Sequence, residues 1–236
     1  MRTTLTARRP TLALVALTLA ASAAAGCANA PATQERDSGA AARIDSKDTD
    51  GLNGTLIDDP PLQIAHVTLR DTDGRPVDLA NIPTGKATVL FFGFTHCDDV
   101  CPTTMADLTA AQRLLPKAIA QNVTIRFVTV DPDRDTPHVL RTWLNRFSPD
   151  ISGLRGSPTL VNKAERSLYA DESSTTAPGP TPTATDGHEH KHTTQDQVSH
   201  SGSVYIFGPD GRTVLYTGGT SPRQYAADLT RLLRRN

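Results

Sequence analysis

The sequence predicts an α/β fold, because stretches typical of buried strands alternate with stretches typical of amphipathic helices. Residues 87–94 and 123–130 are runs of mainly apolar, β-branched and aromatic residues, with the length and content of central strands. Residues 102–119 and 137–147 carry apolar side chains at helical spacing, and each stretch follows one of these strands. A sheet covered by helices is the arrangement that buries both kinds of segment.

Two shorter segments flank this pattern and predict β-hairpins. Residues 64–79 and 203–217 each consist of two short alternating runs around a turn that contains Asp-Gly. A short helix is expected at residues 157–169 and a last one after Ser221. The order β-β, β-α-β-α, then β-β-α is that of a thioredoxin-like fold with extra β-hairpins.

Composition limits the classes of function. The chain has 236 residues, with 24 Lys and Arg against 25 Asp and Glu, for a formal net charge of -1. This balance gives no electrostatic basis for binding nucleic acid. Hydrophobic residues make up 37% of the chain, which is low, so we expect part of it to lie outside a packed core.

The first 26 residues are expected to be an export signal. Three arginines precede an apolar run rich in Ala and Leu that is too short for a membrane-spanning helix. The run ends in Ala-Ala-Gly-Cys, which resembles the bacterial lipobox, where the cysteine is lipidated. We expect Cys27 to carry lipid and to hold the protein at the outer face of the cell membrane. The alternative is an ordinary signal peptide that leaves Cys27 as a spare thiol.

Two segments lack the apolar side chains needed to fold. Residues 27–58, rich in Ala, Asp, Ser and Gly, predict a flexible tether to the folded domain at residues 59–236. Residues 171–197 predict a disordered polar insertion before the last hairpin.

The insertion contains a histidine cluster. Three histidines occupy alternate positions, namely His188, His190 and His192. Such a cluster either binds copper or zinc weakly or is an incidental part of a solvated linker. The sequence favours neither interpretation.

A cysteine pair follows the first buried strand. Cys97 and Cys101 stand where this strand ends and a helix begins, so their sulfurs are expected one turn apart on the same face. The helix N-terminus is expected to lower the pKa of these thiols, whereas the carboxylates of Asp98 and Asp99 oppose that effect. Such a pair can close a disulfide or bind a soft ion such as copper(I) or zinc.

Two sulfurs leave such a metal site short of ligands, and His200 is a candidate for the third. It precedes the second hairpin, and in thioredoxin-like folds the segment that leads into this hairpin lies against the cysteine pair. His200 is therefore either a neutral imidazole ligand or a surface histidine between two serines.

Three motifs then occur in order. Residues 93–102 read G-F-T-H-C-D-D-V-C-P, residues 128–137 read V-T-V-D-P-D-R-D-T-P, and residues 200–206 read H-S-G-S-V-Y-I. Together they resemble the Sco/SenC family, with a similarity that runs from about residue 64 to the C-terminus. The resemblance implies a membrane-tethered domain that binds a copper ion through Cys97, Cys101 and His200.

The resemblance also implies a role in metallating the binuclear copper centre of cytochrome c oxidase subunit II. The protein would act as copper donor, thiol reductant or both, with another copper chaperone or a thiol reductase as a further partner. The alternative is a general thiol–disulfide oxidoreductase of exported proteins, which has no need for His200. A thiol peroxidase is disfavoured because Phe94 occupies the position of the threonine that such enzymes place before the cysteine.

Other residues near the motifs have plainer interpretations. Asp131 and Asp135 could orient a ligand, but we expect helix capping by Asp135 or Thr136. His96 is expected to be a partly exposed turn residue. Met105 and Trp143 are expected in the core. The Met105 thioether could also bind copper(I), but its helical spacing favours the core.

Overall fold

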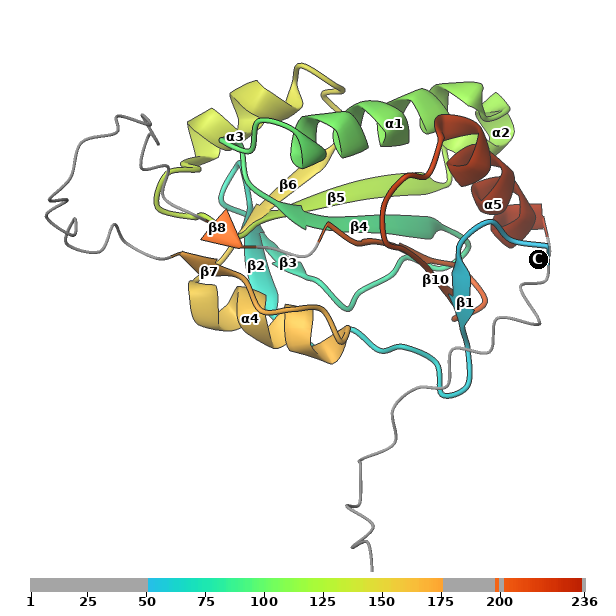
Figure 1. Cartoon of the computed structure of the whole chain (residues 1–236), viewed down its shortest axis with the longest axis horizontal. Helices are drawn as coiled ribbons and strands as arrows, with labels where there is room; N and C mark the ends of the chain where they lie inside the picture. Colours follow the sequence, from blue (N-terminus) through green and yellow to red (C-terminus); the bar gives the residue numbers. More distant parts are fainter. Residues whose placement is uncertain (1–50, 176–197, 200–201, 235–236) are drawn as a thin grey trace, which may run out of the picture. The chain divides into compact units, whose positions relative to one another are not determined.

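The structure is a computed structural model that describes residues 51–175, 198–199 and 202–234 (Figure 1). The chain divides into two units, residues 1–40 and 41–236, and all the described residues belong to the second. The expected signal segment, Cys27, most of the expected tether and the histidine cluster lie outside the described residues.

An eight-stranded sheet has the order β1-β10-β9-β4-β5-β6-β2-β3. Strands β4, β5 and β6 are parallel, and the two hairpins extend this centre at both edges with antiparallel strands. The expected hairpins and both expected central strands are confirmed. The strands are β1 (Thr55–Ile57), β2 (Thr68–Asp71), β3 (Pro76–Asp78), β4 (Ala87–Gly93), β5 (Val123–Thr129), β6 (Ser152–Arg155), β9 (Val204–Phe207) and β10 (Thr213–Tyr216).

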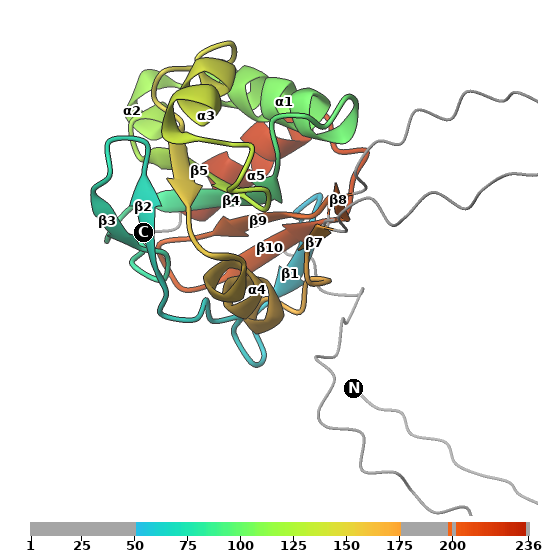
Figure 2. The ribbon, with the colours of Figure 1, turned by 90° about the vertical axis from the view of Figure 1, so that its left-hand side faces the viewer.

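Helices cover both faces of this sheet. Figures 1 and 2 show α1, α3 and α5 over one face and α4 over the other. The element order confirms the predicted thioredoxin-like α/β fold. The helices are α1 (Val100–Leu114), α2 (Lys117–Ala120), α3 (Pro137–Leu144), α4 (Pro158–Ser167) and α5 (Pro222–Arg234).

The core lies along the central strands. Every residue of β4 is buried, because helices cover both faces of the strand and its side chains point alternately to each. The ring centroids of Phe91 and Phe127, on neighbouring parallel strands, lie 5.9 Å apart, and the Trp143 ring packs against Phe127 in a tilted arrangement at 5.1 Å. Met105 is fully buried and Trp143 is 7% exposed, which confirms both as core residues.

The first described residues belong to the domain, although the sequence assigned residues up to 58 to the tether. Strand β1 pairs with β10, and the buried carboxylate of Asp228 in α5 fixes the chain just before it. Asp228 accepts hydrogen bonds from the backbone N–H groups of Asn53 and Gly54 and from the Tyr216 hydroxyl, at 2.8–3.1 Å. These bonds satisfy a buried charge that would otherwise be costly.

The polar insertion has an ordered stem. A two-stranded ladder joins β7 (Ser174–Thr175) to β8 (Val198–Ser199). Ser173 donates from its backbone N–H to the buried carboxylate of Glu165, at 2.9 Å. Residues 171–175, which the sequence placed in the insertion, are therefore part of the described fold.

None of the helices in the described ranges combines the length and the apolar character needed to cross a membrane.

Candidate metal centre

The cysteine pair stands at the turn between β4 and α1. Cys101 lies in the first turn of α1, and its backbone N–H donates to the sulfur of Cys97 at 3.4 Å. The two residues are therefore adjacent, as their spacing predicts. Both are free thiols; Cys97 is half-buried, whereas Cys101 is fully buried. Cys97 is thus partly accessible to solvent, whereas Cys101 lies in the core.

Gly93, the last residue of β4, makes room for the buried sulfur. A Cβ atom at this position would lie 2.8 Å from the Cys101 sulfur, closer than such atoms approach each other in proteins. It would also lie 3.0–3.1 Å from the rings of Phe91 and Phe127. The sulfur therefore occupies the space of the missing side chain, and a glycine is required there for packing.

Burial raises the pKa of the Cys101 thiol above its ordinary value. The neighbouring Cys97 and the carboxylate of Asp135 act in the same direction, and a hydrogen bond with the Phe94 backbone opposes them. The expectation that the helix N-terminus lowers the pKa is therefore wrong for Cys101, because desolvation outweighs the helix dipole. A bound cation would compensate this desolvation by replacing the proton.

Asp135 holds the turn that precedes Cys97. Its buried carboxylate accepts hydrogen bonds from the Thr95 backbone N–H at 3.1 Å, from the Thr95 hydroxyl at 2.5 Å and from the Thr129 hydroxyl at 2.5 Å. Thr136 caps α3, since its hydroxyl accepts the Val139 N–H at 3.3 Å. The capping prediction holds for Thr136 and is wrong for Asp135, which joins two loops instead.

Two arginines fix the loop that carries this carboxylate. The Arg155 guanidinium, from β6, donates to the backbone carbonyls of Pro132 and Asp135, each at 2.5 Å. The Arg134 guanidinium pairs with the Asp131 carboxylate, so Asp131 is engaged within its own loop. Asp135 therefore approaches the cysteine turn from a rigid support.

His96 lies on the exposed side of the same turn. Its Nδ1 atom is 3.1 Å from the Thr95 hydroxyl and 3.7 Å from Oδ1 of Asp135, and its side chain is 54% exposed. The expectation of a partly exposed turn residue is confirmed. The ring and the buried carboxylate thus both contact the Thr95 hydroxyl.

His200 lies outside the described residues, but residues on both sides of it are described. Ser199 ends β8, and Gly202 follows on the other side. A Cβ atom on Gly202 would lie 3.4 Å from a methyl group of Val100, the residue between Asp99 and Cys101. Among the described residues, no group of three or more His, Cys, Asp and Glu side chains could hold a metal ion.

The fold and the cysteine pair define a class of protein: a thioredoxin-like domain with a reduced dithiol across the first turn of its first long helix. The SCO1/SenC family matches residues 59–234. The chain therefore belongs to the SCO1/SenC family.

Two solved structures of this family resemble the described fold. ScoI of Bradyrhizobium japonicum, solved with copper bound, has a TM-score of 0.58 and 30% identity, covering 72% of this chain and 99% of that one. ScoI of Arabidopsis thaliana, also solved with copper bound, has a TM-score of 0.59 and 27% identity, covering 73% and 99%.

Curated relatives carry the same family name. The mitochondrial SCO1 homolog 1 of Arabidopsis thaliana is 39% identical over 99 residues, which are 42% of this chain and 29% of that protein. The mitochondrial SCO2 homolog of Bos taurus is 33% identical over 156 residues, covering 64% and 52%. This chain covers less than two thirds of the length of either relative.

Proposed function

We propose that this protein binds copper through Cys97, Cys101 and His200, and that it serves the assembly of cytochrome c oxidase. In this proposal it delivers copper to the binuclear site of subunit II or reduces the cysteines of that site. The observation that carries the proposal is the reduced pair at the start of α1, with one cysteine half-buried and the other fully buried. The two ScoI structures with copper bound support the choice of metal.

The donor set suits a copper carrier. Two thiolates favour copper(I), and an added imidazole also accommodates copper(II). The cysteines lie on one turn, whereas His200 belongs to a separate segment between β8 and β9. A ligand contributed by a second segment can leave without unfolding the first, so the ion can be exchanged with a partner. Binding at Cys101 releases the proton that burial favours on its thiol.

The same pair can act as a reductant when no copper is bound. The Cys97 thiolate attacks one sulfur of a partner disulfide and forms a mixed disulfide, with the other partner sulfur leaving as a thiolate. The Cys101 sulfur then attacks Cys97, loses its proton and releases the second partner sulfur as a thiolate. The pair has given up two electrons and ends as a disulfide, while the partner cysteines are reduced.

Copper transfer to the soluble domain of subunit II tests this proposal. The copper-loaded protein is mixed with the apo domain whose cysteines are reduced, and copper is followed by the absorption of the binuclear centre. The metal-free protein is mixed in parallel with the oxidised domain, and thiols are counted by mass after alkylation. Formation of the copper centre or of partner thiols supports the proposal. If the wild-type protein gives neither reaction, the proposal is refuted.

A general thiol–disulfide oxidoreductase is the second candidate. The half-buried Cys97 beside the fully buried Cys101 matches an attacking and a resolving sulfur. This candidate predicts equal reduction of unrelated disulfides, such as those of insulin, and no effect of His200→Ala. The copper proposal predicts preference for the subunit II domain and a loss of copper(II) affinity in that variant.

We further propose that Cys27 is lipidated and holds the domain at the outer face of the cell membrane. The lipobox-like end of the leader supports this placement. A diacylglyceryl group supplies the two-chain anchoring that one acyl chain cannot. Cys27→Ser should move the protein to the soluble fraction, and a mature protein with no lipid mass would contradict the assignment.

A further inference from the structure

A shallow pocket of about 360 Å³ opens beside the cysteine turn. His96 lines it from the turn, and the residues opposite come from α3 and the segment that follows, including His138, Trp143 and Arg146. Val139 and the edge of Trp143 supply apolar surface, and Trp143 is held by ring contacts to Phe127 and Phe147. The pocket therefore has a rigid apolar wall.

The pocket holds one permanently charged side chain, Arg146, beside the rings of His96 and His138 and the hydroxyls of Thr95 and Thr142. Arg146 is exposed, and no described residue forms an ion pair or hydrogen bond with its guanidinium. The His138 ring and the indole N–H of Trp143 likewise make no hydrogen bond to any described residue. No carboxylate lines the pocket. The nearby carboxylate of Asp135 already accepts hydrogen bonds from the Thr95 and Thr129 hydroxyls.

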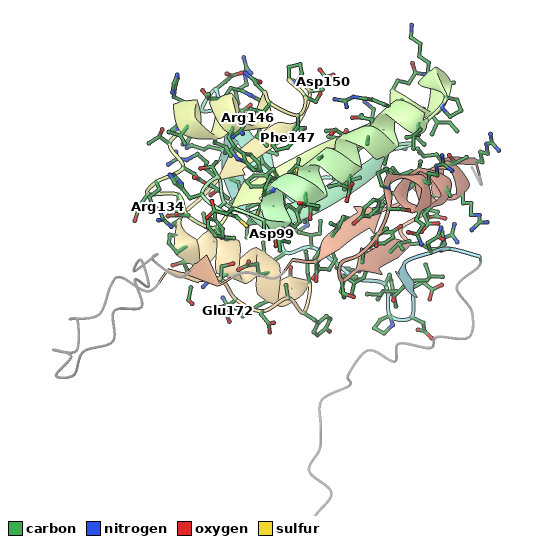
Figure 3. The ribbon with its side chains drawn as sticks, turned by 45° about the horizontal axis from the view of Figure 1, so that its top comes forward. Asp99, Arg134, Arg146, Phe147, Asp150 and Glu172 are labelled. Carbon is green, nitrogen blue, oxygen red and sulfur yellow. The ribbon has the colours of Figure 1, made fainter. Side chains whose placement is uncertain are left out.

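Different polar side chains stand before and after Cys97 in the turn. His96 precedes this cysteine and faces the pocket, whereas Asp98 and Asp99 follow it on the exposed turn before α1. Figure 3 shows Asp99 at the start of α1, and Arg146 beside Phe147 past the end of α3. The turn that carries Cys97 is thus bordered by the pocket that contains Arg146 and by the carboxylates of Asp98 and Asp99.

We infer that this pocket docks an acidic segment of the copper-accepting protein, with a carboxylate placed against Arg146. The inference rests on the proposed function, because it takes the subunit II domain as that acceptor. An unpaired guanidinium beside an apolar wall is a typical anchor at protein interfaces. The Arg146 guanidinium in the pocket and the Asp99 carboxylate before α1 then set the orientation in which the acceptor approaches the metal.

Charge reversal at Arg146 tests the inference. The full-length, copper-loaded protein is titrated with the apo soluble domain of subunit II, and the Kd and the transfer rate are measured at several salt concentrations. We expect Arg146→Glu to raise the Kd about tenfold or more, and Arg146→Ala to raise it less and flatten its salt dependence. Copper stoichiometry and thermal midpoint should not change, because Arg146 is exposed and no described residue pairs with its guanidinium.

Arg223→Glu on α5 is the matched control, since Arg223 is also exposed and lies outside the pocket. Its Kd should stay within about twofold of wild type. Replacing acidic residues of the acceptor by lysine, one at a time, should identify one change that restores binding to Arg146→Glu.

The outcomes separate the two proposals. If the wild type transfers copper and Arg146→Glu binds and transfers equally well, the pocket is not the docking site and the proposed function stands. Equal losses in Arg146→Glu and Arg223→Glu would show a diffuse charge effect and would also overturn the inference. If the wild type does not bind the subunit II domain, and neither transfers copper to it nor reduces its cysteines, both proposals are wrong.

Discussion

The position of the Cys101 sulfur depends on a single neighbouring residue, Gly93. The sulfur occupies space that any side chain at position 93 would need, so the position of this ligand depends on a residue with no chemistry of its own. Motif G-F-T-H-C contains this glycine, but its partner sulfur lies eight residues away. The requirement for glycine emerges only once β4 and α1 are packed together.

Replacement of Gly93 by alanine should therefore damage the metal site. The added methyl must displace the Cys101 sulfur or the neighbouring rings, at a cost of about 1–3 kcal/mol. We expect a lower thermal midpoint and weaker copper binding. Gly153→Ala is the control, because a Cβ there would lie 2.5 Å from Leu144. The control should lower the midpoint and leave copper affinity intact; a loss of affinity in both variants would argue against a specific role for Gly93.

The two thiols should also differ in reactivity. Cys101 is fully buried and its pKa is raised by that burial, so it holds its proton at pH values where an ordinary thiol begins to ionise. In the reduced, metal-free protein, iodoacetamide should therefore modify Cys97 well before Cys101 from about pH 7 to pH 9. Peptide mass spectrometry after timed quenching measures both rates. Equal rates at the two cysteines would show that Cys101 is accessible and ionised.

At the scale of elements, the loop between β5 and α3 supports the turn between β4 and α1. Asp135 provides the link, and it is held in turn by the Arg155 guanidinium from β6. Three neighbouring strands of the sheet, β4, β5 and β6, thus contribute to the position of Cys97. This arrangement explains why the second motif, which supplies no metal ligand in our proposal, is found beside the first.

Loss of this link should loosen the cysteine turn. In Asp135→Ala the Thr95 and Thr129 groups lose their acceptor, which typically costs about 1–3 kcal/mol for buried donors. We expect a lower thermal midpoint and a copper affinity reduced several-fold, with stoichiometry unchanged. Asp133→Ala, an exposed neighbour, is the control and should resemble wild type in a copper competition titration. Wild-type affinity in Asp135→Ala would exclude a positioning role.

The elements differ in how well the sequence predicts them. Strands β4 and β5 are long and buried on both faces, so their apolar runs are unambiguous. Strand β6 was not predicted, because Ser152–Arg155 contains one large apolar residue and depends on pairing with β5 and β2. Strand β1 likewise depends on pairing with β10 and on the hydrogen bond from the Gly54 backbone N–H to Asp228. Short strands of this kind are determined by tertiary contacts rather than by local pattern.

The candidate site shows the same limit. The cysteine pair was predicted from its spacing, because strand, turn and helix are contiguous in the sequence. The link from Asp135 to Thr95 spans 40 residues, and local pattern favoured a helix cap for that carboxylate. The pocket was missed because Arg146 and His138 look like ordinary exposed residues of an amphipathic helix. Three-dimensional proximity to His96 is what gives them a shared role.

At the scale of the whole molecule, the polar insertion leaves and returns through the β7–β8 ladder. This pairing brings Thr175 next to Val198, so a two-residue turn can join them. A variant with Asn-Gly in place of residues 176–197 should keep its thermal midpoint and its tight copper equivalent. Calorimetry and copper titration measure both. A variant that fails to fold or loses the tight copper would show that the insertion has a structural role.

The insertion should instead determine any weaker metal binding. Of the histidines, three lie together in the deleted segment, at positions 188, 190 and 192. Further, weaker copper equivalents in the wild type should therefore disappear in the shortened variant. Replacing the three histidines by alanine in the full-length protein is the matched control. If the weaker copper equivalents persist in both variants, the three histidines are not the residues that bind them.

The central claim is a single copper ion held by Cys97, Cys101 and His200, and copper titration of the full-length protein tests it most directly. For the wild type we expect one tight equivalent, with thiolate-to-copper(II) absorption. Cys97→Ser and Cys101→Ser should each lose tight binding of both oxidation states. His200→Ala should retain copper(I) on its two thiolates and bind copper(II) at least about tenfold more weakly. Unchanged binding of both states by His200→Ala, or tight binding that survives the loss of either cysteine, would contradict the account.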